Sequence, residues 1–168
     1  MEKKTMNNCP FLIVVALLFF GGCSQKQAVD IQPNLLDRLE QQVNEYVDSS
    51  DTTSLTINFN QVTSFEWDYM FIFGPYIPTE FIEGKIGFEW DSAENLITQI
   101  GDTHSLIVFT KGEKVVKYLK YPNNIGDFKK IDNTGPYPTE ISIFLLEKER
   151  YGGEDWLFFY HSPPNISE

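Results

Sequence analysis

Aromatic side chains alternate along residues 65–76, and this alternation constrains the fold more than any other feature of the chain. Side chains two residues apart on a β-strand project from the same face. The positions between the rings change from acidic at Glu66 and Asp68 to apolar at Met70 and Ile72. A strand that becomes apolar on both faces runs from the rim of a sheet into its middle. The pattern therefore predicts a strand that ends at Gly74-Pro75, because proline cannot donate to the ladder. The alternating rings are Phe65, Trp67, Tyr69, Phe71 and Phe73.

Periodicity elsewhere predicts one main helix and further strands. A 3.6-residue apolar repeat covers 35–47, with Asn34 as a candidate N-cap and Asp37 in the first turn. Alternation predicts a strand over 55–59 that forms a hairpin with the aromatic strand. We expect a single α+β domain, a mainly antiparallel sheet of about six strands with one N-terminal amphipathic helix packed on it. Other expected elements are a helical turn at 78–83, a strand breaking into a helix over 88–100, and hairpins over 106–121 and 141–160.

The N-terminus carries an unbroken apolar run of ten residues, 11–20, behind two lysines. A membrane-spanning helix needs about 20 such residues, whereas the core of a signal peptide needs about 7–15. Gly21, Gly22 and Cys23 follow, and the arrangement resembles the lipobox of bacterial lipoproteins, with Phe20 where leucine is usual. The resemblance implies cleavage before Cys23 and acylation of its thiol. The alternative is a generic secretory leader with a coincidental cysteine.

These features divide the chain into a lipoprotein signal peptide (1–22), a lipidated cysteine and tether (23–33) and a soluble α+β domain (34–168). The resemblance implies a palmitate-type anchor in the cell envelope. Ser24 after the cysteine usually accompanies sorting to the outer membrane, facing the periplasm, in Gram-negative bacteria. In a Gram-positive host the anchor would lie on the outer face of the plasma membrane.

Charge and cysteine content exclude several classes of function. The chain from Cys23 onward has 11 basic and 23 acidic residues, a formal charge of −12. This charge repels phosphate backbones, so nucleic acid is not an expected partner, but it would attract a cationic protein or simply maintain solubility. The other cysteine, Cys9, is lost with the leader. The folded domain therefore has no disulfide, thiol nucleophile or cysteine ligand for a metal.

Signals for an enzyme are weak. Glu66 and Asp68 lie two residues apart, about 6.5 Å along a strand, a spacing compatible with glycoside hydrolysis or with a hard cation. Glu89 and Asp91 repeat this spacing, and a solvated polar face explains both pairs equally well. The segment 102–105 (DTHS) contains triad residue types but no nucleophile elbow. We predict no catalytic residue, metal or cofactor, and a periplasmic hydrolase using Glu66 and Asp68 remains the alternative.

Aromatic residues make up 15% of the chain, and several tyrosines fall in or near predicted loops. Exposed tyrosines are frequent anchors for protein partners. The alternative is that they cover the edge of the core. The five candidate partner-binding residues are Tyr76, Tyr118, Tyr121, Tyr137 and Tyr151.

One stretch also resembles a family of small exported bacterial lipoproteins. The family pairs a WD dipeptide with a short aromatic strand and an FGPY turn, as in Trp67-Asp68 and 73–76 here. The likeness is strongest over 63–83 and looser through 106–121. It implies export and a β-sheet, and it transfers no catalytic residue because the family has no assigned activity. We expect a lipid-anchored envelope protein that binds another protein, as inhibitors and immunity proteins do. A purely structural lipoprotein is a further alternative.

Overall fold

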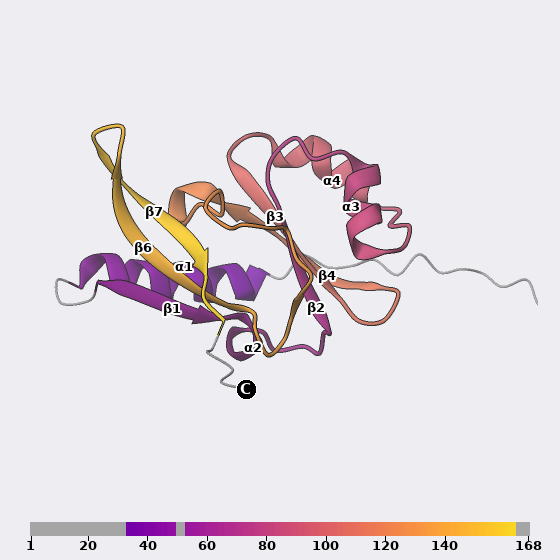
Figure 1. Cartoon of the computed structure of the whole chain (residues 1–168), viewed down its shortest axis with the longest axis horizontal. Helices are drawn as coiled ribbons and strands as arrows, with labels where there is room; N and C mark the ends of the chain where they lie inside the picture. The colour runs from indigo at the N-terminus through magenta and orange to yellow at the C-terminus, as the bar shows by residue number, and fades with distance from the viewer. Residues whose placement is uncertain (1–32, 50–52, 164–168) are drawn as a thin grey trace, which may run out of the picture.

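The computed structural model describes residues 33–49 and 53–163, which form two antiparallel sheets with helices packed against them (Figure 1). The predicted signal peptide and Cys23 lie outside the described residues. The α+β class is confirmed, with the apolar face of an N-terminal helix in the core. The sheet expected as a single unit is instead divided into one of three strands and one of four. In the described ranges, none of the helices is both long and apolar enough to cross a membrane.

The chain forms β1 in one sheet, then all four strands of the other sheet, and returns to the first sheet for β6 and β7. The three-stranded sheet has the order β1-β6-β7 and the four-stranded sheet the order β4-β3-β2-β5. In chain order the elements are α1 (Pro33–Asp48), β1 (Ser54–Asn58), α2 (Phe59–Val62), β2 (Tyr69–Phe73), α3 (Thr79–Ile86), α4 (Ala93–Ile100), β3 (His104–Thr110), β4 (Val115–Pro122), the 3-10 helix η1 (Asn123–Ile125), β5 (Tyr137–Pro138), β6 (Ile143–Tyr151) and β7 (Glu154–His161).

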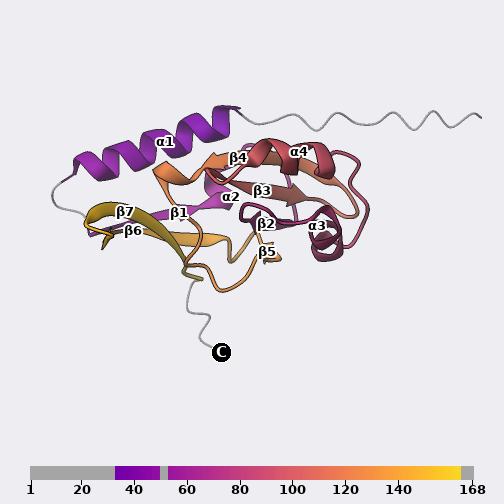
Figure 2. The same cartoon turned by 90° about the horizontal axis from the view of Figure 1, so that it is seen from above.

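Helix α1 confirms the apolar stripe predicted from the sequence. Leu35, Leu39 and Val43 are buried in the core, whereas Val47 at the end of the stripe is 42% exposed. The helix contacts both β1 and β4, so it bridges the two sheets (Figure 2). The N-cap prediction is wrong, because the helix begins at Pro33 and Asn34 lies inside it. Proline suits the first helical position, since its missing N–H would have no partner there.

Strand β2 contributes to two separate hydrophobic cores. Met70 and Ile72 lie in the main core with α1, whereas Phe71 and Phe73 pack on the opposite face beneath α3 and α4. The strand is shorter than predicted, because residues 65–68 lie outside it. Trp67 turns toward the main core, where its ring centroid lies 5.2 Å from that of Phe109 and its Nε1 donates to Thr63 Oγ1 at 2.9 Å.

The predicted hairpin between β1 and the aromatic strand is wrong. β1 instead pairs with β6, with Leu55 opposite Leu146, because α2 leads the chain from one sheet to the other. The segment 88–100 contains only helix α4, without the expected strand. The helix at 78–83 corresponds to α3, and the hairpins β3–β4 and β6–β7 are confirmed.

Gly126 marks a close approach that the fold requires between the loop after η1 and β7. A Cβ at this position would lie 2.5 Å from Phe159 Cε2, and the backbone φ is +152°. We expect Gly126→Ala to lower the free energy of unfolding by about 1–3 kcal/mol, the usual cost of overpacking a core. Gly84→Ala is the matched control, because Gly84 lies in α3 with open space around it and alanine favours a helix. Urea unfolding of both variants checks the prediction, and equal midpoints would contradict it.

Candidate functional site

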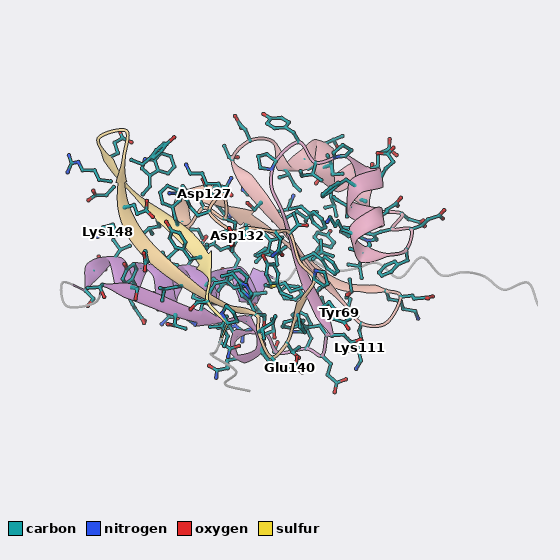
Figure 3. The ribbon with its side chains drawn as sticks, viewed as in Figure 1. Tyr69, Lys111, Asp127, Asp132, Glu140 and Lys148 are labelled. Carbon is teal, nitrogen blue, oxygen red and sulfur yellow. The ribbon has the colours of Figure 1, made fainter. Side chains whose placement is uncertain are left out.

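The paired carboxylates Glu66 and Asp68 hold the turn between β3 and β4. Glu66 forms an ion pair with Lys111, and the side chain of Asp68 accepts a hydrogen bond from the backbone N–H of Gly112 at 2.8 Å. The hydrogen bond from Lys111 and then its charge hold the pKa of Glu66 below its ordinary value. Lys111 directly follows Thr110, which pairs with Tyr69 in the sheet, and both labelled residues lie near the lower edge of the view in Figure 3. Both carboxylates are thus engaged in a structural contact, on a segment that is not a strand.

The other candidates for chemistry do not assemble into a site. Ser105 is buried, and its hydroxyl donates to Asn123 Oδ1 at 2.8 Å rather than to a histidine. The Nδ1 atom of His104 instead lies 2.8 Å from the hydroxyl of Thr103. Glu89 and Asp91 precede α4 in an irregular segment, so they do not share a strand face. Among the described residues, no group of three or more His, Cys, Asp or Glu side chains could hold a metal ion.

The five candidate tyrosines divide between core and surface. Tyr121 and Tyr137 are wrongly predicted as contact residues, because they are 0% and 1% exposed. Their hydroxyls donate to local backbone carbonyls, that of Tyr121 to Ile125 and that of Tyr137 to Asn133. Tyr118 is half-buried in β4, with its ring centroid 5.7 Å from that of Trp90. Only Tyr76 and Tyr151 are exposed, so the five do not form one surface.

Tyr151 belongs to an aromatic surface on the β6–β7 hairpin. Lys129 Nζ lies 4.1 Å from the centre of the Tyr151 ring and 5.7 Å from that of Trp156. A cation over the ring face supplies the contact that a positively charged partner would otherwise make. The hairpin and the helices α3 and α4 lie at opposite ends of the molecule in both views (Figures 1 and 2).

Tyr76 lies in the turn between β2 and α3 and has an unusual backbone conformation. Its φ is +60°, and it is the one residue other than glycine with positive φ among those that the structure describes. Pro75 followed by a residue with positive φ has the pattern of a type II turn, in which glycine normally takes the second place. An L-residue in the left-handed region costs about 1–2 kcal/mol. The ring is 76% exposed, so burial of the side chain does not explain this conformation.

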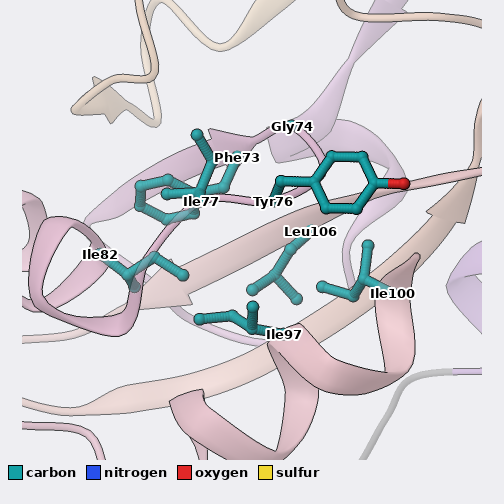
Figure 4. Close-up of a pocket in the computed structure, with 8 residues that line it drawn as sticks. All are labelled: Phe73, Gly74, Tyr76, Ile77, Ile82, Ile97, Ile100 and Leu106. Carbon is teal, nitrogen blue, oxygen red and sulfur yellow. The ribbon is translucent and has the colours of Figure 1, made fainter. Parts of the chain in front are cut away.

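The Tyr76 side chain lies at the mouth of an apolar hollow beneath the turn (Figure 4). Phe73, Ile82 and Ile100 are among the side chains that line the hollow, and they pack so closely that no water-sized sphere fits inside. The hollow is therefore part of the core between β2 and the helices α3 and α4, which we call the second core, and it is not a ligand pocket. It gives the Tyr76 turn a rigid base.

The segment 76–102, which we call the acidic lobe, carries much of the negative charge. It contains six acidic residues and one lysine, a net charge of −5. Phe81 on α3 is 43% exposed, and Lys85 Nζ lies 5.4 Å from the centre of its ring. Sequence reasoning missed Phe81 and this local excess of acids, although the run of Glu and Asp over 80–102 is a readable signal. The acidic residues are Glu80, Glu83, Glu89, Asp91, Glu94 and Asp102.

Comparison with known proteins finds no family model, no curated protein and no solved structure that matches the chain. The resemblance to small exported lipoproteins therefore stays a prediction.

The buried tyrosines predict a loss of stability in alkali. Burial and then the Asp132 carboxylate raise the pKa of Tyr137 to about 12, and burial and then Glu40 raise that of Tyr121 further. A raised folded pKa means that only the unfolded chain ionises near the ordinary value of 10. The free energy of unfolding should therefore be unaffected below pH 10 and fall as the pH rises toward 12.

Phenolate absorbance directly measures how far the tyrosines ionise in the folded and in the unfolded chain. Between pH 10 and pH 12, the native protein should show less phenolate than the chain in urea. Tyr137→Phe should reduce this difference in phenolate between the native and the unfolded chain. Coincident titration curves for the native and unfolded chains would contradict the prediction.

Proposed function

We propose that the chain is a lipid-anchored cell-envelope protein whose folded domain binds a cationic protein through the acidic lobe. The exposed Tyr76, held at positive φ within this lobe, is the observation that supports this function over the alternatives. Backbone strain of this kind, which the surrounding structure maintains, clusters at functional positions. The proposal for the anchor rests on the sequence around Cys23, which lies outside the described residues.

The geometry of Tyr76 suits an anchor residue in an interface. A tyrosine supplies a large apolar ring and a polar hydroxyl, and such residues carry much of the energy of protein–protein interfaces. The backbone of the turn lies over the second core, which fixes where the ring emerges from the surface. Phe81 offers a second apolar contact in the same lobe.

The charge of the lobe favours a basic partner. A segment with a net charge of −5 attracts cationic proteins and accelerates their association, and salt weakens this attraction. At the opposite end of the molecule, Lys129 lies against the exposed rings of the hairpin and occupies the position that a cationic partner would take there. Glu66 is paired with Lys111 and Asp68 accepts a hydrogen bond from Gly112, so the two carboxylates lend no support to the hydrolase alternative.

Tyr76→Gly separates binding from folding. Glycine adopts the same φ without strain, so the free energy of unfolding should stay the same or rise by up to about 1 kcal/mol. Loss of the ring should weaken partner binding by 2 kcal/mol or more, roughly thirtyfold, if Tyr76 is an interface hot spot. Tyr151→Ala at the opposite end is the control and should bind normally.

The measurement is crosslinking capture from detergent-solubilised envelopes with tagged full-length protein. We expect a stoichiometric basic partner with the wild type and with Tyr151→Ala, but not with Tyr76→Gly. Cys23→Ala should abolish capture through loss of the membrane anchor. A partner retained equally by Tyr76→Gly would exclude the acidic lobe as the binding surface, and failure to capture any basic protein would reject the proposed function.

A further inference from the structure

A cleft of about 260 Å³ lies between the loop 127–134 and the four-stranded sheet, away from the acidic lobe helices. Its lining includes the buried side chains of Ile72 in β2 and Phe128 in the loop, together with the half-buried Ile131. The backbone N–H of Ile72 donates to the carbonyl of Thr134 at 2.9 Å, so the loop is fixed to the sheet. The volume is close to the lower limit of small-molecule sites, about 300 Å³, so an occupant must be small.

The charged groups of the cleft differ in whether they are paired. The Asp127 side chain accepts a hydrogen bond from the backbone N–H of Lys129 at 2.8 Å and lies 3.8 Å from Lys129 Nζ. That ammonium group in turn lies over the ring of Tyr151. Asp132 is exposed and forms no hydrogen bond or ion pair with any described residue. The uncompensated charge at the rim is therefore negative. Asp127 and Asp132, which both line the cleft, are labelled close to one another in Figure 3.

Thr134 adds an unused polar group to the cleft lining. Its hydroxyl is buried without a hydrogen-bond partner in the described structure, which is unfavourable for the free protein. Rotation about χ1 exchanges a threonine hydroxyl with its methyl group, so a ligand can recruit this hydroxyl without a change in the backbone.

We propose that this cleft binds a small organic cation, with an apolar body against Ile72, Phe128 and Ile131 and an amine beside Asp132. An apolar surface with a few polar groups that fix orientation is the usual composition of a ligand site. The chain's net charge of −11 raises the local concentration of cations. The proposal does not depend on the protein-binding function of the acidic lobe.

The test compares three probes of similar shape and different charge. 2-Phenylethylamine, 2-phenylethanol and phenylacetate are titrated into purified full-length protein in a calorimeter at physiological salt. The amine should bind with an affinity at least about tenfold higher than that of phenylacetate, because an amine near Asp132 gains and a carboxylate loses Coulomb energy. Asp132→Asn should reduce the affinity for the amine to that for the alcohol. Asp37→Asn, an exposed aspartate on α1, should leave the affinity unchanged.

Methyl NMR of the same samples locates the bound probe. The amine should shift the methyl signals of Ile72 and Ile131, and should leave those of Ile82 and Ile100 in the closed hollow unchanged. Absence of binding in the millimolar range, equal affinity for the amine and phenylacetate, unchanged affinity in Asp132→Asn, or shifts confined to Ile82 and Ile100 would each overturn the proposal.

Discussion

Four consecutive side chains of β2, from Met70 to Phe73, are each at most 3% exposed, and this double burial organises the rest of the structure. A strand with two apolar faces needs a covering layer on each side. The main core, which includes side chains of α1 and of the three-stranded sheet, covers Met70 and Ile72. Helices α3 and α4 cover Phe71 and Phe73. The loop 132–134 also hydrogen-bonds to β2 through Ile72 and Thr134. The acidic lobe and the cleft therefore lie against the same strand.

Local sequence patterns predicted the elements whose packing follows from their own periodicity. The stripe of α1 and the two hairpins belong to this class, because close neighbours in sequence define both their faces and their turns. The pairing of β1 with β6 was not predictable in this way, since it joins segments almost ninety residues apart. The start of β2 was placed too early because Trp67 forms a tertiary contact with Phe109 that period-two alternation does not reveal.

The candidate site shows the same division between local and long-range information. Tyr121 and Tyr137 resembled loop anchors, but each places its hydroxyl on a backbone carbonyl four residues away. Such a local acceptor satisfies the one polar group of the side chain, so the whole residue can be buried. The charge of the acidic lobe was readable from the sequence. The positive φ of Tyr76 was not, because it depends on how the turn meets the second core.

The turn that carries Tyr76 has a position with a further consequence. Gly74 lines both the hollow beneath the acidic lobe and the cleft on the other side of β2, and Pro75 also lines the cleft. One short segment, which contains the residue with positive φ, therefore lies between the two surfaces that we propose as binding sites. If both sites are occupied as proposed, a ligand in the cleft that prefers one conformation of this turn would change the free energy of protein binding at Tyr76. By thermodynamic reciprocity, the bound protein would then change the affinity of the cleft for its ligand by the same factor.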